Sequence, residues 1–273
     1  MEIQVIHKRL DDWVNDLISE GKISFSLRQA IEAFPKLSEI AVKSSLKRLS
    51  VKGNVISIYK GYYLIIPPQY ASRGILSPTM FLDAFMKFLK RPYYVGLLNA
   101  AAFYGAAHQQ PQEFFVLTNF PVLRPTVKKG IKVNYISKSK ILDEYLQNRK
   151  TETGYLKISS PELTAADLVQ FEKRIGGLSR VATVLSELIE EMKPEKINKS
   201  FLKQIPATTI QRLGYLLEKV VKQKEMADHL YSESVKLNLR FLRIPLKASG
   251  KKSKKLPVDE RWNVVVNIEI EMD

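Results

Sequence analysis

The spacing of apolar residues between positions 24 and 66 changes from a strand period to a helix period and back again. Two segments with apolar residues three and four positions apart are followed by two short β-rich runs. We therefore expect a strand at 24–26, helices at 27–34 and 38–52, and a hairpin of strands at 55–58 and 62–66. Strand, helix, helix and hairpin in this order are typical of a winged helix-turn-helix, a module that places one helix in the DNA major groove.

Residues that start and stop helices agree with these boundaries. Ser26 and Ser38 precede the two helices, where a serine hydroxyl accepts a hydrogen bond from a first-turn amide. Pro35 ends the first helix, and Gly53 ends the second because glycine tolerates the left-handed conformation common after a helix. The dipeptide Lys60-Gly61 lies between the two strands and predicts the loop at the tip of the hairpin.

The second helix has two chemically distinct faces. At 100° per residue, Val42, Leu46 and Leu49 share one side, which would face the core. We expect the opposite side to carry three cations, a hydroxyl and no carboxylate, a composition that suits phosphates and base edges. An ordinary solvated helix surface remains the alternative interpretation. With the helix cap and the hairpin tip, the predicted DNA-binding residues are Ser38, Lys43, Ser44, Lys47, Arg48, Tyr59 and Lys60.

Charge supports an anionic partner for this segment. A helix predicted over residues 3–20 is acidic and would pack behind the cationic helix, so the module is polarised as duplex binding requires. Between residues 25 and 75 the only carboxylates are Glu32 and Glu39. The cations of the same segment are Arg28, Lys36, Lys43, Lys47, Arg48, Lys52, Lys60 and Arg73.

The composition of the whole chain points the same way. Over 273 residues the formal net charge is +15 and the pI is about 9.7, which makes nucleic acid the first candidate partner, an acidic protein the second and a membrane surface a distant third. No run of 18 apolar residues occurs, so we expect a soluble, cytoplasmic protein without a membrane partner. The absence of cysteine excludes disulfides, thiol catalysis and cysteine-ligated zinc.

The remainder of the chain predicts a mixed α/β block followed by helices. Ser160 and Pro161 are typical of a helix start, and the region from residue 236 to 261 is basic again. We expect a linker at 69–77, helices at 79–90 and 93–107, strands at 113–118, 131–136 and 155–158, helices at 161–172, 178–192, 198–204, 206–222 and 225–234, and a terminal strand at 262–270.

Catalytic chemistry lacks a sequence signature. No phosphate-binding glycine loop, nucleophile elbow or zinc-protease motif occurs. The histidines at positions 7, 108 and 229 are far apart in the chain, and we expect each to be a surface residue. Glu162 and Asp167 fall on one short helix, where capping and solvation would account for both. We therefore predict no catalytic residue, no metal site and no cofactor, and a protein that is not an enzyme.

Three further motifs carry a resemblance to a known family. They are Tyr94-Val95-Gly96-Leu97-Leu98-Asn99-Ala100-Ala101-Ala102-Phe103-Tyr104-Gly105, Ser159-Ser160-Pro161-Glu162-Leu163-Thr164-Ala165-Ala166-Asp167-Leu168-Val169 and Gln211-Arg212-Leu213-Gly214-Tyr215-Leu216-Leu217-Glu218. With the winged helix before them, the chain resembles the AbiEi antitoxins of type IV toxin–antitoxin (abortive infection) systems. The resemblance implies dual action: repression of the protein's own operon, and neutralisation of a cognate nucleotidyltransferase-like toxin without a stable complex.

The predicted fold class is α+β, with a winged helix-turn-helix DNA-binding domain at residues 1–72 and a larger mixed α/β antitoxin domain at 77–273. Its partners would be double-stranded operator DNA and the toxin. The second dense group of cations predicts an antitoxin surface, at Lys247, Lys251, Lys252, Lys254 and Lys255, whereas a solvated loop is the alternative. A protein-interaction module, or a transcriptional regulator without antitoxin activity, is the alternative function.

Overall fold

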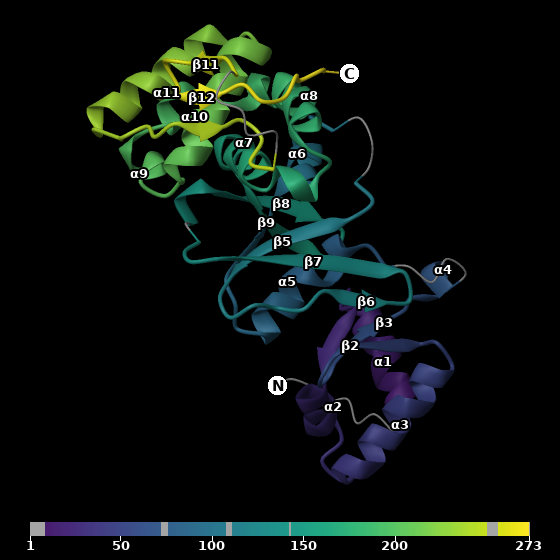
Figure 1. The fold of residues 1–273 in the computed structure, drawn as a ribbon. Helices are drawn as coiled ribbons and strands as arrows, with labels where there is room; N and C mark the ends of the chain where they lie inside the picture. Colours follow the sequence, from purple (N-terminus) through teal and green to yellow (C-terminus); the bar gives the residue numbers. More distant parts are fainter. Residues whose placement is uncertain (1–8, 72–75, 108–110, 142, 250–255, 273) are drawn as a thin grey trace. The chain divides into compact units, whose positions relative to one another are not determined.

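A computed structural model describes residues 9–71, 76–107, 111–141, 143–249 and 256–272 (Figure 1). The chain forms two compact units. The first comprises residues 1–94, 113–142 and 148–157, and the second comprises 95–112, 143–147 and 158–273. These ranges differ from the two domains expected from the sequence, and the domain boundary itself stays a prediction.

The N-terminal module, residues 9–66, has the expected order of elements. Both strand pairs are antiparallel and the strand order is β1-β3-β2. The helix expected over residues 3–20 begins only at Leu10, because the described residue Arg9 has an extended backbone; residues 1–8 lie outside the described part of the chain. The elements are α1 Leu10–Ser19, β1 Ser24–Ser26, α2 Leu27–Ala33, α3 Glu39–Val51, β2 Val55–Tyr59 and β3 Tyr62–Ile65.

The three helices of this module pack around aromatic residues. The ring of Phe25, which is 1% exposed, lies 4.9 Å from that of Trp13 in an edge-on arrangement. The apolar face of α3 fills the other side of this core, as the helix period predicted. Ser38 caps α3 by accepting a hydrogen bond from the amide of Ala41, and Ser26 forms a capping box with Gln29 at the start of α2.

The segment after the hairpin is more ordered than a linker. Residues Pro68–Ala71 form a short helix, α4, so the prediction of a linker at 69–77 is wrong over its first residues; residues 72–75 lie outside the described part. Helix α5, Pro78–Phe88, then packs against the hairpin, with the Tyr62 and Phe88 rings 4.8 Å apart. Aromatic packing therefore joins the hairpin to α5.

A six-stranded sheet has the order β6-β7-β5-β4-β9-β8. Strand β5 pairs in parallel with β7, and β4 pairs in parallel with β9, whereas β6 pairs with β7 in the antiparallel direction. The strands are β4 Tyr93–Val95, β5 Phe114–Asn119, β6 Thr126–Lys128, β7 Ile131–Lys138, β8 Leu146–Thr151 and β9 Gly154–Ser159.

Three of these strands, β4, β6 and β8, were not expected from the sequence. The prediction of one helix over 93–107 is wrong, because Tyr93–Val95 forms β4 and α6 begins only at Leu97. Aromatic and β-branched residues fit a buried strand, and the small residues that favour a helix start at Gly96. The sequence did not predict strand β8, because its residues are mostly polar and its side chains are largely exposed.

The second unit is mainly helical. The terminal strand expected over 262–270 is wrong for most of its length, since only β12 is a strand there. A π-helical turn, Leu216–Val220, follows α10. The α-helices and strands of this unit are α6 Leu97–Phe103, α7 Pro161–Gln170, α8 Leu178–Leu188, α9 Lys199–Leu202, α10 Ala207–Tyr215, α11 Lys224–Lys236, β10 Ile244–Pro245, β11 Val258–Asp259 and β12 Val264–Val265.

One helix of this unit holds the C-terminal segment through a set of contacts that we call the α10 clasp: Gln211, Gly214, Glu218 and Trp262. The indole of Trp262 is fully buried, and its Nε1 donates a hydrogen bond to Glu218 at 2.8 Å. The side-chain amide of Gln211 donates to the carbonyls of Leu242 and Trp262, both at 2.7 Å. Gly214 leaves room for the indole, since a Cβ at this position would lie 2.2 Å from its ring.

We therefore expect Gly214→Ala to destabilise the protein by about 1–3 kcal/mol, the usual cost of forcing an extra carbon into a packed core. Chemical denaturation measures this change. Thr208→Ala, on the exposed side of the same helix, is the control and should change stability by less than about 0.5 kcal/mol. Equal stability of the Gly214→Ala variant and the wild type would contradict the close packing of Gly214 on Trp262.

Candidate nucleic-acid interface

The outer face of α3 is the candidate interface. Val42, Leu46 and Leu49 are 0–1% exposed, so the side of the helix opposite to them faces solvent. The predicted side chains of Lys43, Ser44, Lys47 and Arg48 are all exposed, which confirms the division of the helix into two faces. Ser38 lies at the exposed start of the helix, where its hydroxyl is engaged in capping.

The cations on this face differ in how free they are to meet a phosphate. The ammonium of Lys43 pairs with Glu39 at 2.5 Å, so the expectation of a face without a carboxylate is wrong. Glu39 lies one helical turn before Lys43, and this spacing brings the two side chains together. Among the described residues, Lys47 has no ion pair. Arg48 donates a hydrogen bond from Nη2 to the hydroxyl of Ser45 at 2.9 Å.

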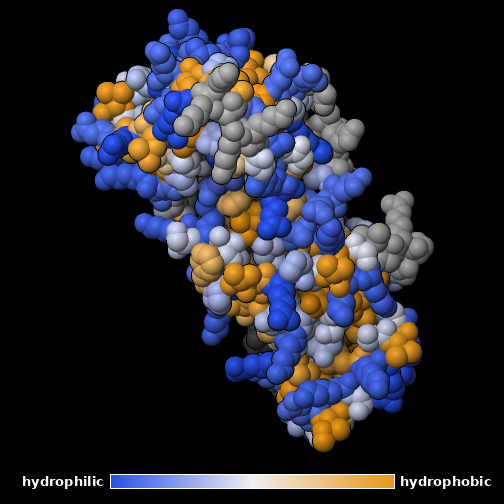
Figure 2. All heavy atoms as spheres, viewed as in Figure 1, coloured by the Kyte–Doolittle hydropathy of each residue, from blue (hydrophilic) through white to orange (hydrophobic). Residues whose placement is uncertain are grey.

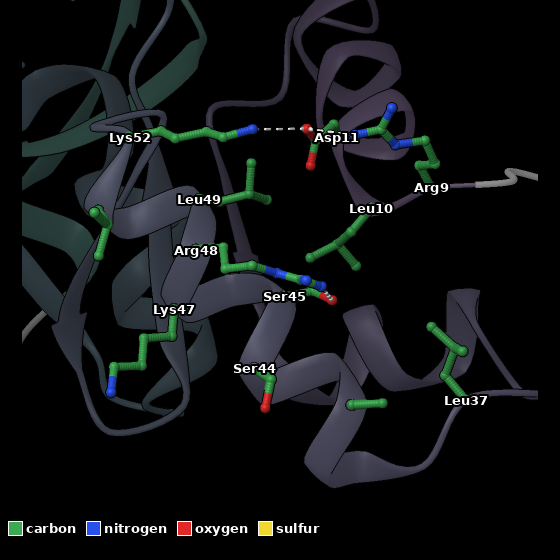
Figure 3. A pocket seen from close by; sticks show the side chains of 12 residues that line it. Arg9, Leu10, Asp11, Leu37, Ser44, Ser45, Lys47, Arg48, Leu49 and Lys52 are labelled. Carbon is green, nitrogen blue, oxygen red and sulfur yellow. Dashed lines mark hydrogen bonds and ion pairs between the residues drawn. The ribbon is translucent and has the colours of Figure 1, made fainter.

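An open groove of about 1050 Å³ runs between α3 and the beginning of α1 (Figure 3). The Arg48 side chain extends into this groove toward Leu10, whereas Lys47 points away from Arg48. Asp11 on α1 lies 3.6 Å from both Arg9 and Lys52, so one carboxylate holds a cation from each side of the groove. The lining has a net positive charge, which suits a phosphate backbone. It contains four cations, Arg9, Lys47, Arg48 and Lys52, and one carboxylate, Asp11.

The hairpin tip presents a free cation. Lys60 is exposed and forms no ion pair among the described residues. The Tyr59 side chain is 43% exposed, and its ring lies edge-on against Phe85 at 5.8 Å. The carbonyl of Gly61 accepts a hydrogen bond from the amide of Leu27 at 2.8 Å, which ties the tip to the start of α2. The tip is therefore held from two sides.

The neighbouring strand shows how closely the hairpin is packed. Burial raises the pKa of the Tyr62 phenol to about 12, and its hydroxyl donates a hydrogen bond to Ser24 at 2.8 Å. Burial also raises the pKa of Tyr63, and the nearby Lys43 ammonium opposes that shift. Lys43 on α3 is therefore near Tyr63 on β3.

Two apolar residues of the candidate interface did not figure in the sequence analysis. Ile40 is 78% exposed and Val51 is 83% exposed, at opposite ends of α3. Hydrophobic patches among hydrophilic ones are visible over the end of the N-terminal module where α2 and α3 lie (Figure 2). The helix period could have found both residues, because at 100° per residue they align with Ser44 and Lys47 on the side opposite to the core.

The predicted C-terminal surface is only partly described. Lys247 is half-buried, and its backbone amide and carbonyl each form a 2.9 Å hydrogen bond with the Asn267 side chain. Lys251, Lys252, Lys254 and Lys255 lie outside the described residues. Another cation of this region is neutralised, since Arg261 pairs with Glu218 at 3.0 Å and Asp228 at 2.7 Å.

The carboxylates considered for chemistry are buried, so the expectation that solvation accounts for Glu162 and Asp167 is wrong. Glu162 is 2% exposed and accepts a hydrogen bond from the amide of Lys193 at 2.9 Å; Asp167 is fully buried. His229 is half-buried, with Nε2 3.0 Å from the carbonyl of Ile197. Within the described ranges, no group of histidine and carboxylate side chains could hold a metal ion.

Two comparisons with known proteins bear on this arrangement. Residues 94–219 match the family model described as the AbiEi antitoxin C-terminal domain, and the match includes all three motifs that carried the resemblance. The family resemblance is thereby confirmed. The crystal structure of the RV2827C protein from Mycobacterium tuberculosis has a TM-score of 0.68 and 14% identity, over 93% of this chain and 90% of that one. At this identity the likeness shows the fold alone.

No curated protein matches the chain. Within the part of the chain that the structure describes, no helix is long and apolar enough to cross a membrane.

The Glu39–Lys43 pair leads to a testable expectation. Glu39→Gln should raise the affinity of the protein for duplex DNA about two- to fivefold, because it frees Lys43 from a pair of the kind worth ~0.3–1 kcal/mol. A gel-shift titration at constant salt measures the change. Glu20→Gln is the matched control, since Glu20 is equally exposed at 56% and pairs with Lys22 at the far end of α1. A weaker complex with the Glu39→Gln variant would show that Glu39 itself assists binding.

Proposed function

We propose that this protein, whose residues 94–219 match the AbiEi antitoxin C-terminal domain, is a type IV antitoxin that also represses its own operon. The N-terminal module would act as a winged helix-turn-helix on operator DNA. The rest of the chain would neutralise a nucleotidyltransferase-like toxin. The antitoxin role is supported by the domain match, and the DNA-binding role is supported by the geometry of α3.

The observation that carries the DNA-binding half is the orientation of α3. Its apolar face is fully buried, so its outward side must present Ser44 and Lys47, with Arg48 beside them. A helix followed directly by a hairpin is the arrangement in which the helix enters the major groove. Lys60 and the exposed part of Tyr59 would then meet the phosphate backbone or the minor groove beside it. Ser38 would contribute at the N-terminal end of the helix, where the helix dipole favours a phosphate.

The antitoxin half would rely on the cations of the C-terminal segment. The α10 clasp holds the backbone of this segment at Leu242 and Trp262, and Arg212 donates to the carbonyl of Pro245 at 3.1 Å. Residues on both sides of the lysine-rich stretch are therefore bound to α10. We propose that this stretch attracts an anionic target, either the toxin or its nucleotide or RNA substrate, without a stable complex. The lysines concerned are Lys247, Lys251, Lys252, Lys254 and Lys255.

The second candidate function is a protein-interaction module that docks an acidic partner. The exposure of Ile40 and Val51 favours it, because exposed apolar side chains on one face are common at protein interfaces. The salt dependence of binding to duplex DNA distinguishes the two functions. DNA binding releases counterions, so the logarithm of affinity falls steeply and linearly with the logarithm of salt concentration.

For the DNA-binding half, we expect the double substitution of Lys47 and Arg48 by alanine to weaken binding of the protein's own promoter by about 10- to 100-fold. The salt slope should fall by roughly one for each phosphate that the variant no longer neutralises. Gel-shift titrations at several salt concentrations measure both quantities, and circular dichroism checks the fold. Replacing Lys22 and Lys87 by alanine serves as the control, since both cations are exposed and neither lies on α3 or in the lining of the groove. Unchanged promoter affinity would refute the DNA-binding half.

For the antitoxin half, we expect glutamine at the five C-terminal lysines to reduce protection of cells that express the toxin encoded beside this gene. The Lys47 and Arg48 double variant should protect fully, because those residues belong to the DNA-binding face. Viable counts after toxin induction, with equal amounts of each variant confirmed by immunoblot, measure protection. Full protection by the five-lysine variant would show that these cations are not needed.

A further inference from the structure

We propose that Ile40 contacts the C5-methyl group of a thymine in the major groove, so that an apolar contact at the start of α3 sets part of the operator preference. This inference rests on the proposed DNA-binding function and deepens it. The observation that motivates it is the position of a large aliphatic side chain, 78% exposed, on a face whose neighbours are polar and cationic.

The helix geometry places Ile40 on the outermost line of α3. At 100° per residue, Ile40, Ser44, Lys47 and Val51 fall within 60° of one another, opposite to the buried residues of the helix. The two ends of this line, Ile40 and Val51, are its most exposed hydrophobic positions. The line therefore begins and ends with an apolar side chain and has a hydroxyl and an ammonium between them.

The two apolar ends are not equivalent in a DNA complex. In helix-turn-helix proteins, residues at the N-terminal end of the recognition helix contact the base edges. Ile40 is the second residue of α3, whereas Val51 is its last, about 16 Å further along the axis. Ile40 would therefore lie among the bases, and Val51 would lie near the edge of the groove.

The chemistry of the major groove selects thymine for such a residue. Thymine is the only base that presents a methyl group there, and apolar side chains contact it. A β-branched side chain has few rotamers to lose on binding, so Ile40 is suited to a fixed apolar contact. Ser44, one turn further on, and Lys47 can bond to neighbouring base edges or phosphates. The surrounding cations supply the charge complementarity that brings the apolar group to an otherwise polar surface.

The test removes the methyl group from the DNA instead of changing its sequence. The promoter fragment of the protein's own operon is made once with thymidine and once with deoxyuridine, which lacks the C5-methyl group. Dissociation constants are measured by fluorescence anisotropy for the wild type, Ile40→Ala and Val51→Ala. Because both substituted residues are highly exposed, the variants should fold, and circular dichroism verifies this.

We expect the wild type to bind the deoxyuridine fragment about three- to tenfold more weakly, the range for burying one or two methyl groups. Ile40→Ala should bind thymidine DNA more weakly and show a thymidine-to-deoxyuridine ratio near one. Val51→Ala is the matched control and should keep the ratio of the wild type. The conservative variant Ile40→Val should keep most of the wild-type preference for thymidine DNA over deoxyuridine DNA.

Each contrary result has a separate meaning. Failure of the wild type to bind either fragment overturns the proposed DNA-binding function. Binding by the wild type with the same ratio for Ile40→Ala overturns the inference on Ile40 and leaves the proposed function intact. If the thymidine-to-deoxyuridine ratio falls to near one in Val51→Ala but not in Ile40→Ala, the assignment of the N-terminal end of α3 to the bases is overturned.

Discussion

Burial of one face of α3 is the constraint on which the candidate interface depends. Val42, Leu46 and Leu49 enter a core that also holds Trp13 and Phe25, and their removal from water fixes the rotation of the helix about its axis. Once that rotation is set, the outward side chains follow from helical geometry alone. A polar or charged surface can then be varied with little effect on folding, because stability comes from the opposite face.

Carboxylates decide how much of the net charge of +15 is available to a partner. Asp11 holds Arg9 and Lys52 beside the groove, Glu39 holds Lys43, and Glu218 holds Lys219 together with Arg261. The pairs of Asp11 and Glu39 are exposed or half-exposed, so each contributes little to stability, whereas the Glu218 side chain is only 14% exposed. The main effect of these pairs is on the distribution of positive charge over the surface. In the first unit, Lys47 and Lys60 form no ion pair among the described residues, and the lining of the groove between α1 and α3 has a net positive charge.

The second unit uses polar contacts to hold a segment with little regular structure. Gln211, Arg212 and Glu218 meet backbone carbonyls or the Trp262 indole, and Gly214 admits that indole against the helix axis. A segment with so few strand bonds cannot satisfy its backbone groups alone, so side chains from α10 supply the partners. Gln211, Arg212, Gly214 and Glu218 all lie within the range that matches the AbiEi antitoxin C-terminal domain, and each has this structural role.

The order of elements in the N-terminal module, the caps at Ser26 and Ser38, and the division of α3 into two faces all followed from the sequence, because they depend on residues at most four positions apart. Features that depend on distant partners did not follow. The strand Tyr93–Val95 needs neighbours in the sheet, the burial of Glu162 and Asp167 needs helices far along the chain, and Trp262 becomes a core residue only because Gly214 makes room for it. Local spacing thus determined which surface α3 presents, whereas packing between remote segments decided which polar groups are buried.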